Sequence, residues 1–253
     1  AKVVHIPTNG ALLPQLVEQM SRMREITDAE LIVGISLDGL AATHDRIRRQ
    51  PGSYEQAWAT FHALRQLGGV SLKITTVLSD QNVDEILPLM DEVARHQPDF
   101  HSVILLRGNP ASPTIGLPPL DRLRALGPEI FQRLAVYDYG RQGLGAQVLR
   151  NFHRYLWKVS LTTIEEKRQA IPCLAGQAHM VVMGDGGVSS CEMLPAVGNV
   201  AELSLAAIRR SAPFREQVRS IKAGECWCTH NCALLPSIFF NPANWPHLLR
   251  SSD

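Results

Sequence analysis

The sequence predicts an α/β protein in which a parallel sheet or barrel precedes a small cysteine-rich region. Between residues 1 and 106, four segments with strand patterns alternate with helical segments, which is typical of parallel strands joined by helices. All five cysteines lie in residues 173–232, and three of them share one Cys-x-Cys-x-x-x-Cys run. Such crowding indicates that a chemical group bridges the thiols.

The first two strand–helix units are predicted from apolar spacing. Residues 1–6 have the pattern of a buried strand, and apolar residues recur at helical spacing over 13–26. Residues 31–37 are almost continuously apolar, as expected of a parallel strand that is covered on both faces. A polar, basic connection is expected at 43–49, and Ser53 then caps the next helix in capping-box spacing.

The next two strands follow the same order. Residues 70–78 alternate between apolar and polar side chains, which indicates a strand. Asn82 and Glu85 have the spacing of a second capping box at the start of the following helix. The fourth strand is predicted at 101–106, and the prolines of residues 109–119 predict an irregular loop after it.

The remaining elements lead into and through the cysteine region. Helices are expected at about 120–134 and 146–166, and a short hairpin is expected around the glycine-rich turn 184–187. Two short helices are expected at 204–209 and 213–221.

The expected organisation has three parts. They are a partial barrel at residues 1–119, a helical bridge at 120–171 and a cysteine-rich domain at 172–253.

Composition sets limits on the function. The formal net charge is +1, so the whole chain lacks the strongly basic balance of proteins that bind nucleic acids or anionic membranes. Hydrophobic residues make up 45% of the chain and charged residues 19%, as in globular proteins. No apolar run approaches the roughly 18 residues of a membrane helix. We expect a cytoplasmic protein.

The cysteines could be bridged by disulfides, a zinc ion or an iron–sulfur cluster. Disulfides would leave one thiol over, because the count of five is odd. Zinc and a four-iron cluster both take four thiolates, and spacing does not separate them, although it slightly favours zinc.

Polar residues gather where the predicted strands end, which is where α/β folds bind ligands. The segments are Thr8-Asn9-Gly10, Ser36-Leu37-Asp38-Gly39, Thr76-Val77-Leu78 and Arg107-Gly108-Asn109. Taken singly, each of them also has the composition of an ordinary turn.

Together with the cysteines, these segments resemble radical S-adenosylmethionine enzymes that carry a SPASM or twitch extension. The first part of the resemblance is carried by Thr8-Asn9-Gly10, Ser36-Leu37-Asp38-Gly39, His44-Asp45-Arg46-Ile47-Arg48, Pro51-Gly52-Ser53-Tyr54, and Thr75-Thr76-Val77-Leu78 with Asn82. The second part is carried by Cys173, Gly176, Gly186, Cys191, Gly198-Asn199, Cys226, Cys228 and Cys232.

The resemblance implies a partial (β/α)6 barrel and one auxiliary 4Fe-4S cluster, and it overrides the slight preference for zinc. Cys173, Cys191 and Cys232 are the leading ligands, while Cys226 and Cys228 compete for the fourth position. His230 is a weaker candidate ligand.

The resemblance also implies contacts to S-adenosylmethionine. Ser36 would contact its ribose or methionyl part, Arg48 its carboxylate, and Leu106 would flank its adenine. Asp38 is a further candidate, with a turn role before Gly39 as the alternative. Arg107 is a candidate anion contact, with a salt bridge to a neighbouring helix as the alternative.

Glu192 follows Cys191 directly, and in related sulfatase-maturating enzymes an acidic residue at this place is thought to take a substrate proton. We therefore expect Glu192 to lie beside the auxiliary cluster at the barrel mouth and to act as the acid–base residue, with a pKa raised by partial burial. A solvated glutamate at a strand end is the alternative.

The family's Cys-x-x-x-Cys-x-x-Cys loop does not occur in this sequence. The expectation is therefore an N-terminally truncated chain that is inactive alone. The parent enzyme would receive an electron from an external electron donor and cleave S-adenosylmethionine to a 5′-deoxyadenosyl radical. This radical would abstract hydrogen from a peptide or small carbohydrate-like substrate. A non-catalytic binding protein with a structural zinc or iron–sulfur site is the alternative.

Overall fold

The computed structural model describes residues 1–108 and 114–250 and divides the chain into two compact units. Unit 1 comprises residues 1–106 and 110–146, and unit 2 comprises residues 107–109 and 147–253. The helical bridge predicted at residues 120–171 is thus shared between the two units. Part of the predicted proline-rich loop, residues 109–113, lies outside the described residues.

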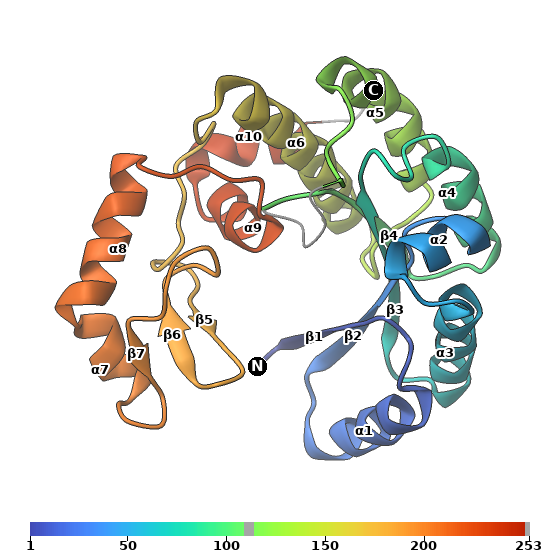
Figure 1. Cartoon of the computed structure of the whole chain (residues 1–253), viewed down its shortest axis with the longest axis horizontal. Coiled ribbons are helices and arrows are strands. Elements are labelled where there is room, and N and C mark those ends of the chain that lie inside the picture. Colours follow the sequence, from blue (N-terminus) through green and yellow to red (C-terminus); the bar gives the residue numbers. More distant parts are fainter. Residues whose placement is uncertain (109–113, 251–253) are drawn as a thin grey trace. The chain divides into compact units, whose positions relative to one another are not determined.

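Unit 1 is built on a four-stranded parallel sheet in the order β1-β2-β3-β4 (Figure 1). The strands are β1 (Val3–Thr8), β2 (Glu30–Ser36), β3 (Ser71–Leu78) and β4 (Phe100–Leu105). Consecutive strands in sequence are neighbours in the sheet and lie parallel, so each connection is a crossover that carries at least one helix. The predicted α/β fold with four parallel strands is confirmed.

Helices connect and cover this sheet. They are α1 (Leu13–Ile26), α2 (Ala41–Arg48), α3 (Ser53–Leu67), α4 (Ile86–Arg95) and α5 (Leu120–Leu134). Alternate residues of β2 and β3, such as Val33 and Ile74, are buried against Met20 of α1, Phe61 of α3 and Leu89 of α4. Burial of this apolar face fixes the register of the strands, because a shift by one residue would turn the apolar side chains outward.

Three local predictions in unit 1 were wrong. The expected polar connection at 43–49 contains α2, which ends where Arg49 adopts a left-handed conformation with φ 54°. Ser53 does not cap α3 but donates its hydroxyl to Asp45 Oδ1 at 2.9 Å. Asn82 does not cap α4, since its Oδ1 accepts from the Ser79 N–H at 2.9 Å. The side chains of Ser53 and Asn82 are therefore hydrogen-bonded to other groups and do not cap these helices.

Unit 2 combines helices with a small antiparallel sheet. Its helices are α6 (Leu144–Glu166, from Gln147 onward), α7 (Leu205–Arg210), α8 (Ala212–Ala223), α9 (Asn231–Phe239), η1 (Pro242–Asn244) and α10 (Trp245–Leu249). The sheet order is β5-β6-β7, with β5 (Val181–Val182), β6 (Gly187–Ser189) and β7 (Gly198–Asn199). The hairpin of β5 and β6 was predicted, whereas β7, α9 and α10 were not.

Unit 2 has a core of its own. Phe152 and Leu156 of α6 pack with Leu234 and Ile238 of α9 and with Leu248 of α10. Within the described residues, none of the helices combines the length and the apolar content that crossing a bilayer demands.

Candidate metal centre

Three cysteines of unit 2 lie in segments that backbone and side-chain contacts hold in place. Cys173 precedes Leu174, whose N–H donates to Ser237 Oγ of α9 at 2.9 Å. Cys191 follows β6, and Ser189 Oγ donates to its carbonyl at 2.7 Å. The N–H of Cys228 donates to Gln169 Oε1 at 3.2 Å. These contacts anchor three separate chain segments.

Packing brings the segments together. Cys191 is buried in a cluster with Ala175 and Ile221, and the half-buried Cys173 packs against it. Ile221 belongs to α8, which ends with Gly224 at φ 74° and turns directly toward Cys226. The helix therefore connects the first pair of cysteines with the second.

Burial and the neighbouring thiols raise the pKa values of Cys191, Cys226 and Cys228. Burial raises the pKa of Cys191 and the charge of Cys173 raises it further. Burial, Cys173 and Cys191 raise the pKa of Cys226. Burial raises the pKa of Cys228 to about 11, together with the charges of Cys191, Cys173 and Cys226. In the absence of a cation, thiolates at these positions would repel one another, and a bound cationic centre reverses this effect.

The donor set fits a thiolate-bound cluster. Backbone N–H groups of Met193 and Glu192 donate to the Cys191 sulfur, and that of His230 donates to the Cys228 sulfur. Hydrogen bonds to sulfur are a feature of iron–sulfur sites. A single zinc ion would hold its sulfurs about 3.8 Å apart, as follows from tetrahedral bonds of about 2.3 Å. Among the described cysteines no three sulfurs lie within 4.8 Å of one another, which suits a larger group.

Cys232 lies with different neighbours. Its sulfur, an oxygen of Glu192 and a ring nitrogen of His230 all lie within 4.8 Å of one another. The Glu192 carboxylate contacts His230 Nε2 and lies 3.6 Å from Arg107 Nη2. Arg107 therefore pairs with Glu192, which lies in a turn after β6, and not with a residue of a neighbouring helix.

His230 is buried and caps α9. Its Nδ1 accepts the Cys232 N–H at 3.2 Å, so the proton of the neutral ring is on Nε2, which faces Glu192. Burial lowers the pKa of His230, and burial also lowers that of His179, which feels the charges of His230 and Glu192. Sequence reasoning missed His179, because a single histidine in a hairpin strand gives no signal.

Unit 1 has a second polar cluster at the carboxyl ends of its strands. Asp38 is buried, and its Oδ2 lies 2.5 Å from Arg48 Nη2. Asp38 Oδ1 accepts the Val77 N–H at 2.9 Å, and the Asp38 N–H donates to His44 Nδ1 at 3.0 Å. Asn82 Nδ2 donates to the Asp38 carbonyl at 2.6 Å. Asp38 therefore joins β2, β3 and α2.

His101 and Thr76 form a buried pair beneath these strand ends. Thr76 donates its hydroxyl to the Leu37 carbonyl at 2.7 Å and lies 2.8 Å from His101 Nε2. Because the threonine proton is used, His101 Nε2 must donate to Thr76 Oγ1. Burial lowers the pKa of His101 to about 3, with a smaller effect from Lys73.

Two further predicted contacts lie at strand ends. Ser36 is the last residue of β2 and is half-buried. Leu106 follows β4, and its N–H donates to the Leu78 carbonyl at 2.9 Å. Ser36, Asp38 and Arg48 thus share one end of the sheet with Leu106. Their contacts to a ligand stay predictions.

Comparisons with known proteins define the class. Residues 173–233 match the SPASM family, described as an iron-sulfur cluster-binding domain. This match includes all five cysteines as well as α7 and α8. The cysteine-rich part of unit 2 is therefore a SPASM domain.

The longer matches are to proteins whose names refer to S-adenosylmethionine (AdoMet). The chain is 27% identical over 235 residues to the AdoMet-dependent heme synthase of Methanosarcina barkeri (strain Fusaro / DSM 804), covering 84% of this chain and 59% of that protein. Two solved structures of anSMEcpe with bound AdoMet, one of the histidine-tagged protein and one of the native protein, have TM-scores of 0.59 and 0.57 at 15% identity. They cover 87% and 85% of this chain and 60% and 58% of theirs.

These findings agree on what the chain resembles. Residues 173–233 match the SPASM family, and most of the chain is similar in sequence to an AdoMet-dependent heme synthase and in fold to anSMEcpe. The chain spans about three fifths of the length of the relatives it matches.

Proposed function

We propose that this chain is the sheet-and-SPASM portion of an enzyme that cleaves S-adenosylmethionine and uses the resulting 5′-deoxyadenosyl radical to abstract hydrogen from a substrate. The observation that carries the proposal is the packing of Cys173 and Cys191 against Ile221 of α8, whose C-terminal end leads into the segment of Cys226 and Cys228. These residues would hold one auxiliary 4Fe-4S cluster, which supplies a one-electron centre when bound.

The side chains around the thiols have separate roles in this proposal. Arg107 and His230 hold the Glu192 carboxylate next to Cys191, so that Glu192 has a fixed position from which to accept a substrate proton. In unit 1, Asp38 orients Arg48, and the remaining N–H groups of the guanidinium are available for a carboxylate such as that of S-adenosylmethionine.

Two observations each favour a candidate substrate. Resemblance of the sequence motifs favours a peptide or a small carbohydrate-like molecule. The 27% identity to the AdoMet-dependent heme synthase favours haem synthesis as a second candidate. Absorbance titration of the chain with haem distinguishes the two: a saturable shift of the haem band supports the second candidate, and its absence excludes haem as a bound product.

Anaerobic reconstitution with iron and sulfide tests the proposal. We expect a brown protein with about four irons per chain and a reduced electron paramagnetic resonance signal typical of a 4Fe-4S cluster. The competing proposal, a binding protein with a structural zinc, predicts a colourless protein that keeps zinc and takes up no iron. Such an outcome would remove the enzymatic proposal. A reducing cytoplasm, where thiolates persist, completes the proposal.

A further inference from the structure

The SPASM domain of this chain concentrates its positive charge on one side of two helices. All five lysines and arginines of residues 173–233 lie between Arg209 and Lys222, in α7 and α8. Glu216 is the single acidic residue of the segment 209–222, so this segment has a net charge of +4. The whole chain has a net charge of only +1, so this is a local concentration.

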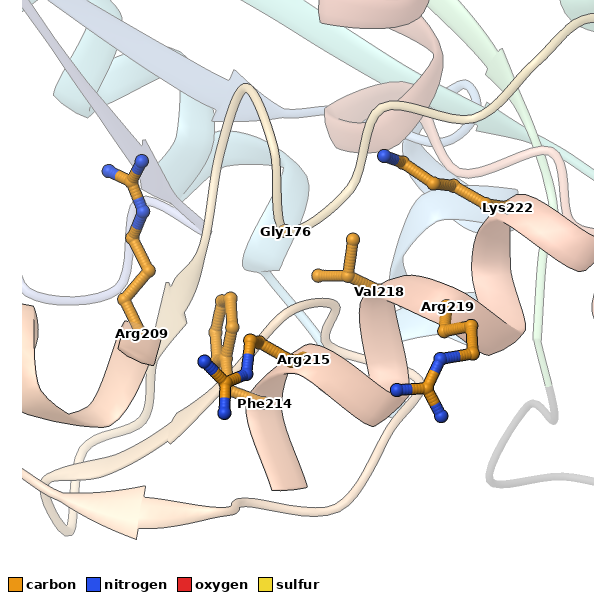
Figure 2. A pocket seen from close by; sticks show the side chains of 7 residues that line it. All are labelled: Gly176, Arg209, Phe214, Arg215, Val218, Arg219 and Lys222. Atoms are coloured by element: carbon orange, nitrogen blue, oxygen red, sulfur yellow. The ribbon is translucent and has the colours of Figure 1, made fainter. Parts of the chain in front are cut away.

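Four of these cations surround an open pocket of about 390 Å³ (Figure 2). Its lining consists of Gly176, Arg209, Phe214, Arg215, Val218, Arg219 and Lys222. Phe214 is buried and Val218 half-buried, so the base of the pocket is apolar. Figure 2 shows the four cationic ends spread around Phe214 and Val218, without converging on one point.

The cations are largely available to a partner. Arg219 forms an ion pair with Glu216. Arg209, Arg215 and Lys222 are exposed and form no ion pair with any of the described residues. Arg215 and Arg219 are four residues apart on α8, and like charges at this spacing repel each other. An anionic partner would relieve that repulsion.

The same helix lies against the thiols. Ile221 of α8 packs with Cys191 and Cys173, while its neighbour Lys222 and Val218 line the pocket. The basic side chains and the thiols are thus separated by about one helix, whose diameter is about 10–12 Å. A partner bound at the pocket would be close to any group that the thiols hold.

We propose that the basic face formed by Arg209, Arg215, Arg219 and Lys222 docks the acidic surface of a small one-electron carrier protein. The carrier part of this inference rests on the proposed function, because it requires a cluster at the thiols. One electron leaves the reduced cofactor of the partner, a flavin or an iron–sulfur centre, and enters the cluster. No atom or proton is transferred.

The geometry favours a protein over a small anion. A single phosphate or carboxylate needs donors that converge, whereas these cations are spread along two helices. An acidic protein surface presents several carboxylates at comparable spacing, and apolar contacts at Phe214 and Val218 can add to the electrostatic attraction. Electrostatic docking of this kind is strongly weakened by salt.

Titration of the full chain with a reduced acidic flavodoxin tests the proposal. At low salt we expect binding in the micromolar range that weakens at least tenfold between 50 and 500 mM NaCl. The variant Arg215→Glu, Arg219→Glu, Lys222→Glu should bind at least tenfold more weakly at 50 mM. A matched control reverses Lys2, Arg22 and Lys158, which are exposed elsewhere, and should bind like the parent.

Several outcomes overturn the proposal. They are equal binding by the parent and the α8 variant, an equal loss in the control, and no binding of the flavodoxin to the parent. Tighter binding of a DNA duplex that the α8 variant abolishes would make nucleic acid the occupant. Iron is measured on the same samples: an iron-loaded chain that does not bind flavodoxin overturns the docking alone, whereas a chain that takes up no iron overturns the proposed function.

Discussion

The carboxylate of Asp38, buried at the end of β2, lies 2.5 Å from the guanidinium of Arg48 at the end of α2. The arginine that the sequence assigns to a ligand carboxylate thus already has a protein carboxylate as its partner. Asp38 also accepts a backbone N–H from β3, so the pair fixes the start of the connection after β2.

Replacement of Asp38 by Asn should therefore destabilise unit 1. Loss of one partner of a buried ion pair typically costs 3–5 kcal/mol, and the partial exposure of Arg48 reduces the expected cost to about 2–3 kcal/mol. Asp84, which pairs with Arg122 at the surface, provides the control. In urea unfolding, Asp84→Asn should change the free energy of unfolding by less than about 1 kcal/mol. Equal losses in both variants would contradict this prediction.

His101 should make the fold sensitive to acid. Burial lowers its pKa to about 3 in the folded chain, against a value near 6.5 in the unfolded chain. Between these values the unfolded chain binds one more proton, so stability falls as the pH falls from 6.5 toward 3, by up to about 1.4 kcal/mol per pH unit.

Urea unfolding at several pH values checks this effect. His101→Gln removes the titrating ring but keeps a donor for Thr76, so the variant should lose less stability than the parent between pH 6.5 and 4.5. Burial also lowers the pKa of His62 on α3, but by less than that of His101, so His62→Gln is the control and should follow the parent more closely than His101→Gln does. Parallel pH profiles for the parent and His101→Gln would refute the assignment.

Gly176, three residues after Cys173, should tolerate substitution by a larger residue poorly. Its φ is +75°, and an added Cβ would lie 2.6 Å from Val218 Cγ2 and 2.8 Å from Ser190 Cβ. We expect Gly176→Ala to destabilise the chain by about 2–4 kcal/mol, from backbone strain and overpacking together.

Gly224 separates these two causes. It has a similar φ of +74° but no atom within 4 Å of an added Cβ. Gly224→Ala should therefore cost only the backbone strain, about 1–2 kcal/mol. Chemical unfolding of the two variants measures the difference, and a cost for Gly224→Ala as large as that for Gly176→Ala would show that crowding at Gly176 is unimportant.

The sequence predicted the parallel sheet well because its signal is local. Residues 31–37 are almost continuously apolar, and Leu31, Val33 and Ile35 of β2 are buried. The helix at 13–26 was predicted with the observed bounds. Helix α2 was missed because its sequence is polar, with only Thr43 and His44 buried. Helix α9 was missed because it contains Pro236 and is capped by a histidine, which is not a usual cap.

The candidate site was predicted only in part, because thiol spacing does not specify which sulfurs meet. Cys226, Cys228 and Cys232 lie within seven residues, and the sequence favoured Cys232. The turn into α9 separates them: Cys232 lies in the helix beside its cap His230, whereas Cys228 precedes it. The partners of Glu192 are His230 and Arg107, which lie 38 and 85 positions away in the sequence. No local sequence pattern predicts contacts over such separations.

Iron content after anaerobic reconstitution of two single variants tests the four-thiol site most directly. Cys228→Ala and Cys232→Ala remove thiols four residues apart, one before α9 and one in its first turn, and the two variants serve as controls for each other's effect on folding. We predict that Cys232→Ala retains about four irons per chain, while Cys228→Ala loses most of them. Retention of iron by Cys228→Ala together with its loss in Cys232→Ala would contradict the account.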